Sequence, residues 1–189
     1  MSYQKLLDDM SYSLSDADLK QLLGNDMRII KYSQLSDYKS IQQLLPNETF
    51  DHIILLVELL ENVGHYECIV RVGQSIFFFD SYGVRPDKAL LFAKKQFRRE
   101  LGQKWPLLSY LLNKAEDENF NVMFSTFPYQ KKDNYISTCG RWCALFIYYM
   151  KHAKPRQQNF TGFHKYVTSQ AKKYEYKSLD MWATHATTT

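Results

Sequence analysis

Three strand-like segments separated by short turns occupy residues 50–83, and they constrain the fold more than any other feature. The first, Phe50–Glu58, contains a continuous apolar run, the second alternates from His65, and the third, which closes at Asp80, is rich in aromatic residues. The turn Val72–Ser75 predicts a hairpin between the last two segments. Because helical patterns lie on both sides of this block, the sequence predicts an α+β fold, with a central mixed or antiparallel sheet packed against helices.

A cysteine at the expected start of a helix is the next informative feature. Cys139 opens an apolar helical pattern that extends to His152. The positive end of a helix dipole lowers the pKa of a thiol and raises the fraction of nucleophilic thiolate. Free backbone N–H groups at the helix start can bind a developing oxyanion, and Gln130 offers an amide donor on the approach. The alternative interpretation of Cys139 is a small buried residue before a core helix.

Cys143 is a rival nucleophile on the same helix. It follows Cys139 by four positions, which places it on the same helix face, one turn further in. We expect it to be deeper and less exposed than Cys139. Cys143 is therefore interpreted as a core residue.

A histidine and an aspartate flank the predicted hairpin. His65 opens its first strand and Asp80 closes its second strand, so antiparallel pairing places both at the same end of the sheet. A carboxylate beside an imidazole fixes its tautomer and stabilises its cation, as in a catalytic triad. The alternatives are a solvent-exposed histidine at a strand end and an aspartate that begins the turn Ser81–Gly83.

In chain order, these motifs resemble the adenain-like cysteine proteases: Gly64-His65-Tyr66, Phe79-Asp80-Ser81-Tyr82-Gly83, Gln130 and Ser137-Thr138-Cys139-Gly140. That family contains the maturation proteases of adenoviruses and of related large DNA viruses, virophages and polinton-type elements. It shares its fold with ubiquitin-like-protein-specific proteases. The resemblance spans roughly residues 50–152 and is closest to the virophage and polinton-type members.

The resemblance implies roles for individual residues. Cys139 would be the catalytic nucleophile at a helix N-terminus, His65 the general base and Asp80 its orienting acid. Gln130 would donate to the oxyanion, with Asn134 as the alternative donor because the Gln130–Cys139 interval is longer than in SUMO-type members. Tyr66 stands where the family commonly has Trp.

The resemblance also implies a function. We expect a cysteine endopeptidase that cleaves virion structural precursors, the capsid proteins, near small residues such as Gly. Tyr66 and Trp142 are candidates for the walls of the substrate cleft, and both are equally interpretable as core residues. Two alternatives remain: an isopeptidase that removes a ubiquitin-like modifier, and a non-enzymatic capsid or DNA-packaging protein with a protease-like fold. An acetyltransferase on the same cysteine scaffold is also conceivable.

The length of 189 residues fits one domain. We expect an N-terminal helical extension at 1–48, a catalytic core at 50–152, and a C-terminal helix and tail at 153–189. The odd number of cysteines, three, does not indicate a disulfide framework, and no paired Cys/His spacing indicates zinc. No metal or cofactor is predicted. Neither a signal peptide nor a bilayer-spanning run is recognised, so no membrane partner is expected.

Capping residues and periodicity predict the remaining elements. Expected strands are Met27–Tyr32 and Phe120–Thr126. The chain end, Ala183–Thr189, is expected to fray. Expected helices are Ser15–Gly24, capped at both ends, Ser36–Leu45 before Pro46, Lys88–Leu101, Trp105–Asn113, Cys139–His152 and a last helix Asn159–Tyr174.

The formal net charge of +4 is too small to establish a nucleic-acid partner. The basic clusters Lys94–Arg99 and Lys172–Lys173 would suit packaged DNA, but solvated helix faces explain them more simply. A maturation protease must be restrained until assembly, so a DNA or peptide activator is a hypothesis. The expected protein is a monomer located in the virion and in the viral factory of the host cytoplasm.

Overall fold

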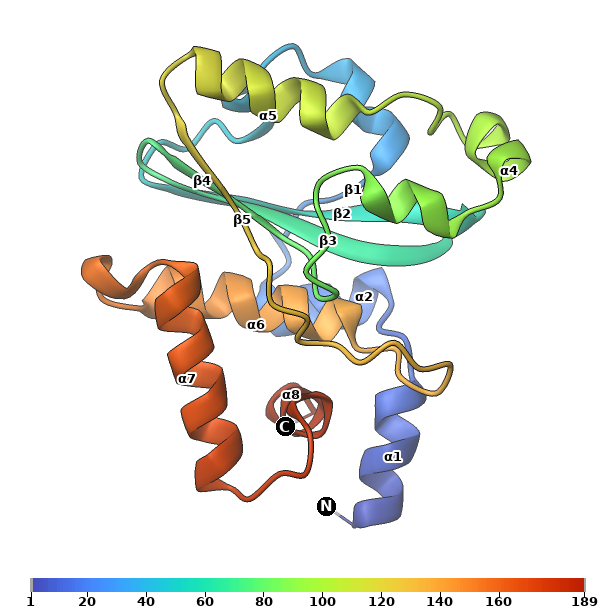
Figure 1. Cartoon of the computed structure of the whole chain (residues 1–189), viewed down its shortest axis with the longest axis vertical. Coiled ribbons are helices and arrows are strands. Elements are labelled where there is room, and N and C mark those ends of the chain that lie inside the picture. Colours follow the sequence, from blue (N-terminus) through green and yellow to red (C-terminus); the bar gives the residue numbers. More distant parts are fainter. Residues whose placement is uncertain (1, 189) are drawn as a thin grey trace.

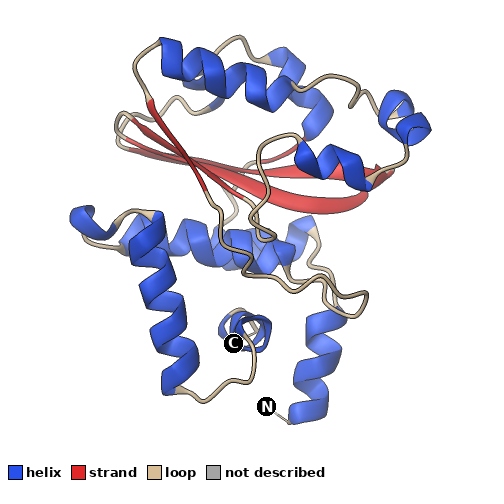
Figure 2. Ribbon diagram, in the orientation of Figure 1, coloured by secondary structure: helices blue, strands red, loops and turns tan. Residues whose placement is uncertain are grey.

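A five-stranded sheet forms the middle layer of the computed structural model, which describes residues 2–188 (Figures 1 and 2). Its strand order is β1-β2-β3-β4-β5. The three central strands are antiparallel, whereas the edge strands β1 and β5 pair in parallel with β2 and β4. The fold is therefore α+β with a mixed sheet, as predicted. The strands are β1 (Ile29–Lys31), β2 (Phe50–Leu60), β3 (Val63–Val72), β4 (Ser75–Phe79) and β5 (Asn121–Phe124).

Helices cover both faces of the sheet, as Figure 1 shows. One face is covered by the 3₁₀ helices η1 (Tyr32–Asp37) and η2 (Lys88–Phe92) and by α3 (Ile41–Leu44), α4 (Lys95–Glu100) and α5 (Leu107–Asp117). On the other face α6 (Cys139–His152) lies along the sheet. Around α6 are α1 (Tyr3–Ser11), α2 (Asp16–Leu23), η3 (Pro155–Gln157), α7 (Phe160–Lys173) and α8 (Leu179–Ala186).

Strand β2 supplies side chains to two separate cores. Ile54 and Leu56 pack on the α6 side, whereas Ile53 and Leu55 pack on the α5 side, and all four are buried. Alternation along a strand sends neighbouring side chains to opposite faces, so a strand covered on both faces needs a continuous apolar run. Full burial of each such side chain contributes about 1.5–3 kcal/mol. The run in β2 thus fixes the sheet between two helical layers.

Two predicted helices are wrong in extent because tertiary packing breaks them. Within Ser36–Leu45 the structure has the end of η1, an extended Tyr38 and then the short helix α3. Ser40 caps α3, because its hydroxyl accepts from the backbone N–H of Gln43. Within Lys88–Leu101 it has η2 and α4, because Ala93 is extended and buried between them.

The two chain ends are more ordered than expected. Helix α8 follows α7, so the prediction of fraying over Ala183–Thr189 is wrong as far as Thr188, and Thr189 lies outside the described residues. Thr187 and Thr188 accept hydrogen bonds from the Arg141 guanidinium on α6, which ties the C-terminal turn to the helix. At the other end, α1 was not predicted, and residues 1–48 contribute strand β1 as well as helices.

The two basic clusters lie in different layers. Residues 94–99 are at α4 on one side of the sheet, and Lys172 and Lys173 are at the end of α7 on the other (Figure 1). The lysines of the two clusters are all exposed: Lys94, Lys95, Lys172 and Lys173. Separation of the clusters gives no single basic face, which favours the interpretation as solvated helix surfaces. Within residues 2–188, no helix has the length and hydrophobicity needed to span a bilayer.

Candidate active site

The structure brings His65 and Asp80 together across the β3–β4 pair. Imidazole Nε2 lies 2.5 Å from Asp80 Oδ2, and both side chains are buried. The other carboxylate oxygen, Oδ1, accepts from the backbone N–H groups of Tyr82 at 2.8 Å and Val84 at 3.2 Å. Because each carboxylate oxygen has its own donor, Asp80 is fixed in place and orients the ring of His65.

Aromatic rings also hold His65. Tyr82 stacks on the imidazole with ring centroids 5.0 Å apart, and Phe92 of η2 meets its edge at 5.7 Å. Burial lowers the pKa of His65, but its hydrogen bonds with Asp80 and Cys139 outweigh burial and raise the pKa well above its usual value. Since Nε2 is bonded to Asp80, Nδ1 is the ring nitrogen left to interact with the thiol.

Cys139 is the first residue of α6, as predicted, and is partly exposed. Burial raises the pKa of the thiol, but the hydrogen bond and charge of His65 and backbone hydrogen bonds from Tyr66 and Gly140 lower it, and the net pKa is below the usual value. The arrangement therefore favours a thiolate beside an imidazolium. Backbone N–H groups in the first turn of a helix have no intrahelical partner and remain available to an oxyanion.

Cys143 has the opposite environment. It is fully buried, and its Sγ lies 3.5 Å from the carbonyl oxygen of Tyr66. Burial, the hydrogen bond with Cys68 and nearby negative charge raise its pKa well above the usual value. The interpretation of Cys143 as a core residue is confirmed.

Gln130 braces the loop that leads to Cys139. Its carbonyl oxygen accepts from the Ser81 hydroxyl at 2.8 Å, and its Nε2 donates to the carbonyl of Ile136 at 3.0 Å. A side-chain amide carries two N–H donors, so this bond uses one of the two. Asn134, the alternative donor, is exposed in a turn.

Asp180 of α8 is a site residue that the sequence did not indicate. Its buried carboxylate accepts from the Thr138 hydroxyl at 2.6 Å, the Trp142 indole N–H at 3.0 Å and the backbone N–H of Lys131 at 2.9 Å. These bonds fix the residue before Cys139, the next turn of α6 and the start of the loop. An acidic residue in the first turn after Ser178 could have indicated α8, but no local pattern indicates contacts 38–49 residues away.

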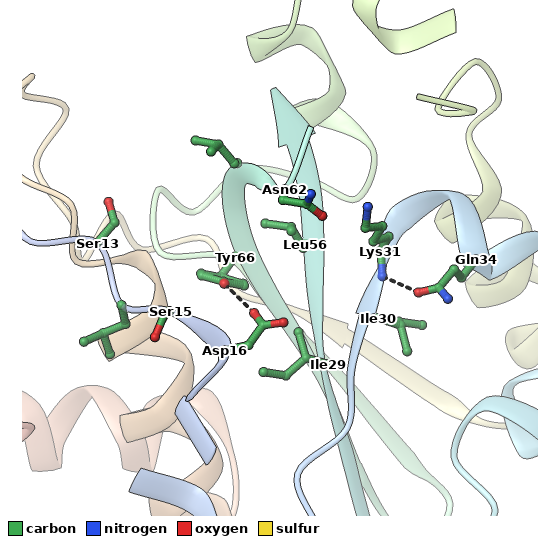
Figure 3. A pocket seen from close by; sticks show the side chains of 13 residues that line it. Ser13, Ser15, Asp16, Ile29, Ile30, Lys31, Gln34, Leu56, Asn62 and Tyr66 are labelled. Atoms are coloured by element: carbon green, nitrogen blue, oxygen red, sulfur yellow. Dashed lines mark hydrogen bonds between the residues drawn. The ribbon is translucent and has the colours of Figure 1, made fainter. Parts of the chain in front are cut away.

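A cleft of about 600 Å³ lies beside Tyr66, between the start of α2, β1 and the β2–β3 hairpin (Figure 3). The phenol of Tyr66 donates to Asp16 at 2.8 Å, and both side chains line the cleft. Tyr66 also packs beside the start of α6, because a Cβ atom added at Gly140 would lie 3.3 Å from its ring. Trp142 is completely buried and does not line this cleft, so of the two predicted wall residues Tyr66 lines it and Trp142 does not.

The tight β2–β3 hairpin requires a glycine before His65. A Cβ atom at Gly64 would lie 2.0 Å from the carbonyl oxygen of Val57 on the paired strand. No other residue fits without moving that backbone. Gly64 therefore allows β3 to pair closely with β2 at the residue before His65.

Comparisons with known proteins relate the chain to one virophage protein. No family model matches it. Among solved structures it is similar to the central domain of the uncharacterized Lpg1148 protein from Legionella pneumophila (13% identity, TM-score 0.41, 93% of this chain and 96% of that one). A de-sumoylating protease is also similar (13% identity, TM-score 0.31, 96% and 79%). The chain is 34% identical over 164 residues to the uncharacterized protein V9 of Sputnik virophage, which covers 86% of this chain and 87% of the relative. It therefore belongs to the same family as Sputnik virophage protein V9.

Proposed function

We propose that this chain is a cysteine endopeptidase of the adenain-like type that processes virion structural precursors. The observation that carries the proposal is the arrangement of His65, bonded through Nε2 to Asp80, near Cys139 at the start of α6, where the imidazole and the thiol shift each other's pKa. A partly exposed thiol of lowered pKa beside an oriented imidazole is the chemistry of a thiol nucleophile.

The proposed reaction is peptide-bond hydrolysis through a thioester. The thiol proton passes to Nδ1 of His65, and the thiolate attacks the scissile carbonyl to form a tetrahedral oxyanion. His65 then gives the proton to the leaving amine, so the C–N bond breaks and an acyl-thioester remains. Water, deprotonated by His65, hydrolyses the thioester and restores the free thiol.

Two donors are proposed for the oxyanion. One is the backbone N–H of Cys139, in the first turn of α6, and the other is the second Nε2 hydrogen of Gln130. Each such donor contributes about 3–4 kcal/mol in a serine protease. Because Gln130 is held at both ends of its amide, it would need little reorganisation to donate.

The cleft beside Tyr66 is the proposed path of an extended substrate. Apolar residues line it, and its wall residue Tyr66 packs against Gly140, the residue after Cys139, so a peptide in the cleft would have to pass Tyr66 to bring its scissile bond to Cys139. Membership of a virophage protein family supports a viral substrate, for which we propose capsid precursors cleaved near small residues such as Gly. The reaction would take place in the virion and the viral factory.

The test is cleavage of the capsid precursor encoded with the protein. Purified wild-type protein and Cys139→Ala are incubated with the precursor and, separately, with fluorogenic C-termini of ubiquitin-like modifiers. We expect precursor cleavage by wild type alone. Efficient modifier cleavage with an intact precursor would instead support the isopeptidase, and no cleavage of either would support a non-enzymatic role.

The same assay tests control by a polyanion. The precursor reaction is repeated with DNA and with an excess of salt, because salt screens phosphate contacts with lysine and arginine. We expect a rate increase with DNA that disappears at high salt. Full activity without DNA would remove the activator hypothesis and leave the catalytic assignment unchanged.

A further inference from the structure

A second acidic side chain, Glu67, lies beside the proposed pair of His65 and Asp80. Glu67 is on β3, two positions after His65 and therefore on the same face of the strand, and its side chain is completely buried. Among residues 2–188, neither of its carboxylate oxygens has a hydrogen-bond donor. Burying a carboxylate without a partner costs several kcal/mol, so such a group needs a proton or a cation.

The neighbours of Glu67 suit a cation. One ligand atom from each of His65, Glu67 and Asp80 lies within 4.8 Å of the other two, and all three residues are buried. Cys68 pairs with Phe79 across the β3–β4 ladder, so the next residue pair outward is Glu67 and Asp80. The three side chains therefore come from neighbouring positions at one end of the β3–β4 pair.

We propose that His65, Glu67 and Asp80 bind a divalent transition-metal ion, for which Zn²⁺ is the best fit. One imidazole nitrogen and two carboxylate oxygens form a donor set that zinc accepts, and the ion would neutralise both carboxylates. Zinc holds such ligands at about 2.0–2.2 Å, so tetrahedral ligand atoms lie about 3.3–3.6 Å apart. The 2.5 Å contact between His65 and Asp80 would have to open by about 1 Å on binding.

Bound zinc would block the proposed chemistry, and this consequence rests on the proposed function. In the metal-free site, Nε2 of His65 carries the proton toward Asp80, and Nδ1 is free to accept the thiol proton. Zinc would take the lone pair of Nε2, so the ring proton would move to Nδ1. An Nδ1–H group cannot remove a proton from Cys139. Zinc would thus hold the protein inactive until a chelator or a competing site removed the ion.

The experiment measures zinc binding without requiring proteolysis. Cys139→Ala protein removes the thiolate, which would otherwise offer zinc a different site with His65. Its affinity for Zn²⁺ is measured in competition with a chromophoric chelator, and ¹⁵N NMR of histidine reports which ring nitrogen binds. We expect one zinc ion per chain and a signal of metal-bound Nε2 from His65.

Matched variants in the same background locate the site. Glu67→Gln should weaken zinc binding at least tenfold, as should Asp80→Asn, whereas Glu61→Gln, the same change at an exposed position of the β2–β3 turn, should leave it unchanged. Circular dichroism checks that each variant is folded. Equal affinity in Glu67→Gln and its parent, or no zinc bound by the folded parent, would overturn the proposal and would indicate that Glu67 holds a proton instead. Either result leaves the precursor assay of the proposed function unaffected.

Discussion

Cys139 and Cys143 are four residues apart on α6, yet their surroundings give them opposite chemistry. Cys139 is partly exposed beside His65, and its pKa is lowered. Cys143 is completely buried beside Cys68, and its pKa is raised well above the usual value. Since the residue type and the helix are the same, the partners and the position along the helix make the difference.

The first turn of a helix differs from the second in a way that explains this contrast. At the first turn, free N–H groups and the positive end of the dipole stabilise a negative charge. One turn further in, the N–H groups are used within the helix, and Cys143 instead faces the Tyr66 carbonyl, which repels a thiolate. The comparison teaches that, on α6, the helix start favours a thiolate and the second turn disfavours it.

Exchanging each cysteine for alanine gives the largest expected effect. Cys139→Ala should reduce precursor cleavage on the order of 10⁴-fold or more, because no nucleophile remains. Cys143→Ala should still cleave and should lower the free energy of unfolding by about 1–2 kcal/mol, because it leaves a small cavity. Cleavage assays and urea unfolding measure the two effects. Active Cys139→Ala with inactive Cys143→Ala would reverse the assignment.

Removing the imidazole should bring Cys139 closer to ordinary thiol behaviour. His65→Ala should reduce cleavage about 10²–10⁴-fold, because the general base and acid are lost. His152→Ala, at the exposed far end of the same helix, is the control and should retain the wild-type rate. The rates of all three proteins are compared in excess chelator. A wild-type rate in His65→Ala would disprove the role of the pair.

Asp180 holds the start of α6, the helix on which the two cysteines have different pKa values. Asp180→Ala leaves the Thr138 hydroxyl and the Trp142 indole without their buried acceptor, so we expect about 3 kcal/mol lower stability. Asp180→Asn retains one acceptor oxygen and should lose less. Thermal unfolding of both variants gives the comparison. Melting temperatures equal to that of wild type would show that the network does not support α6.

The pH dependence of alkylation compares the reactivity of the two thiols directly, and its expected effect is the smallest of these predictions. The lowered pKa of Cys139 means that its thiolate persists below the pH at which an ordinary thiol is protonated, so iodoacetamide at pH 7 should modify it about tenfold faster than an exposed ordinary cysteine. The rate should fall as the pH falls through the pKa of Cys139. Cys143 should react only on unfolding, because it is buried and its pKa is raised.

Mass spectrometry of chelator-treated protein identifies the modified residue in each sample. In His65→Ala the Cys139 profile should move to higher pH, because the imidazole that stabilises the thiolate is absent. Equal rates for the two cysteines in folded protein would contradict the assigned environments.

Local patterns in the sequence predicted the elements that carry the site. The apolar run of β2, the glycine turn after Val72 and the Ser15 cap of α2 are each decided by neighbouring residues, and the structure has all three. The start of α6 at Cys139 was also predicted, because an apolar helical period begins there. Order along the chain and residue type were enough to nominate His65 and Asp80.

Only the tertiary structure decided how distant segments complete the site. In the fold, Nε2 of His65 is the ring nitrogen that faces Asp80. Asp180 of α8 contacts Thr138 at the start of α6, and Glu67 is buried beside His65 and Asp80. The tertiary structure also broke the expected helix over Lys88–Leu101 at Ala93. Spacing along a chain reports which face a side chain takes within one element. The free energy that fixes contacts between elements comes from burial and from pairing of polar groups across the fold, which no local spacing records.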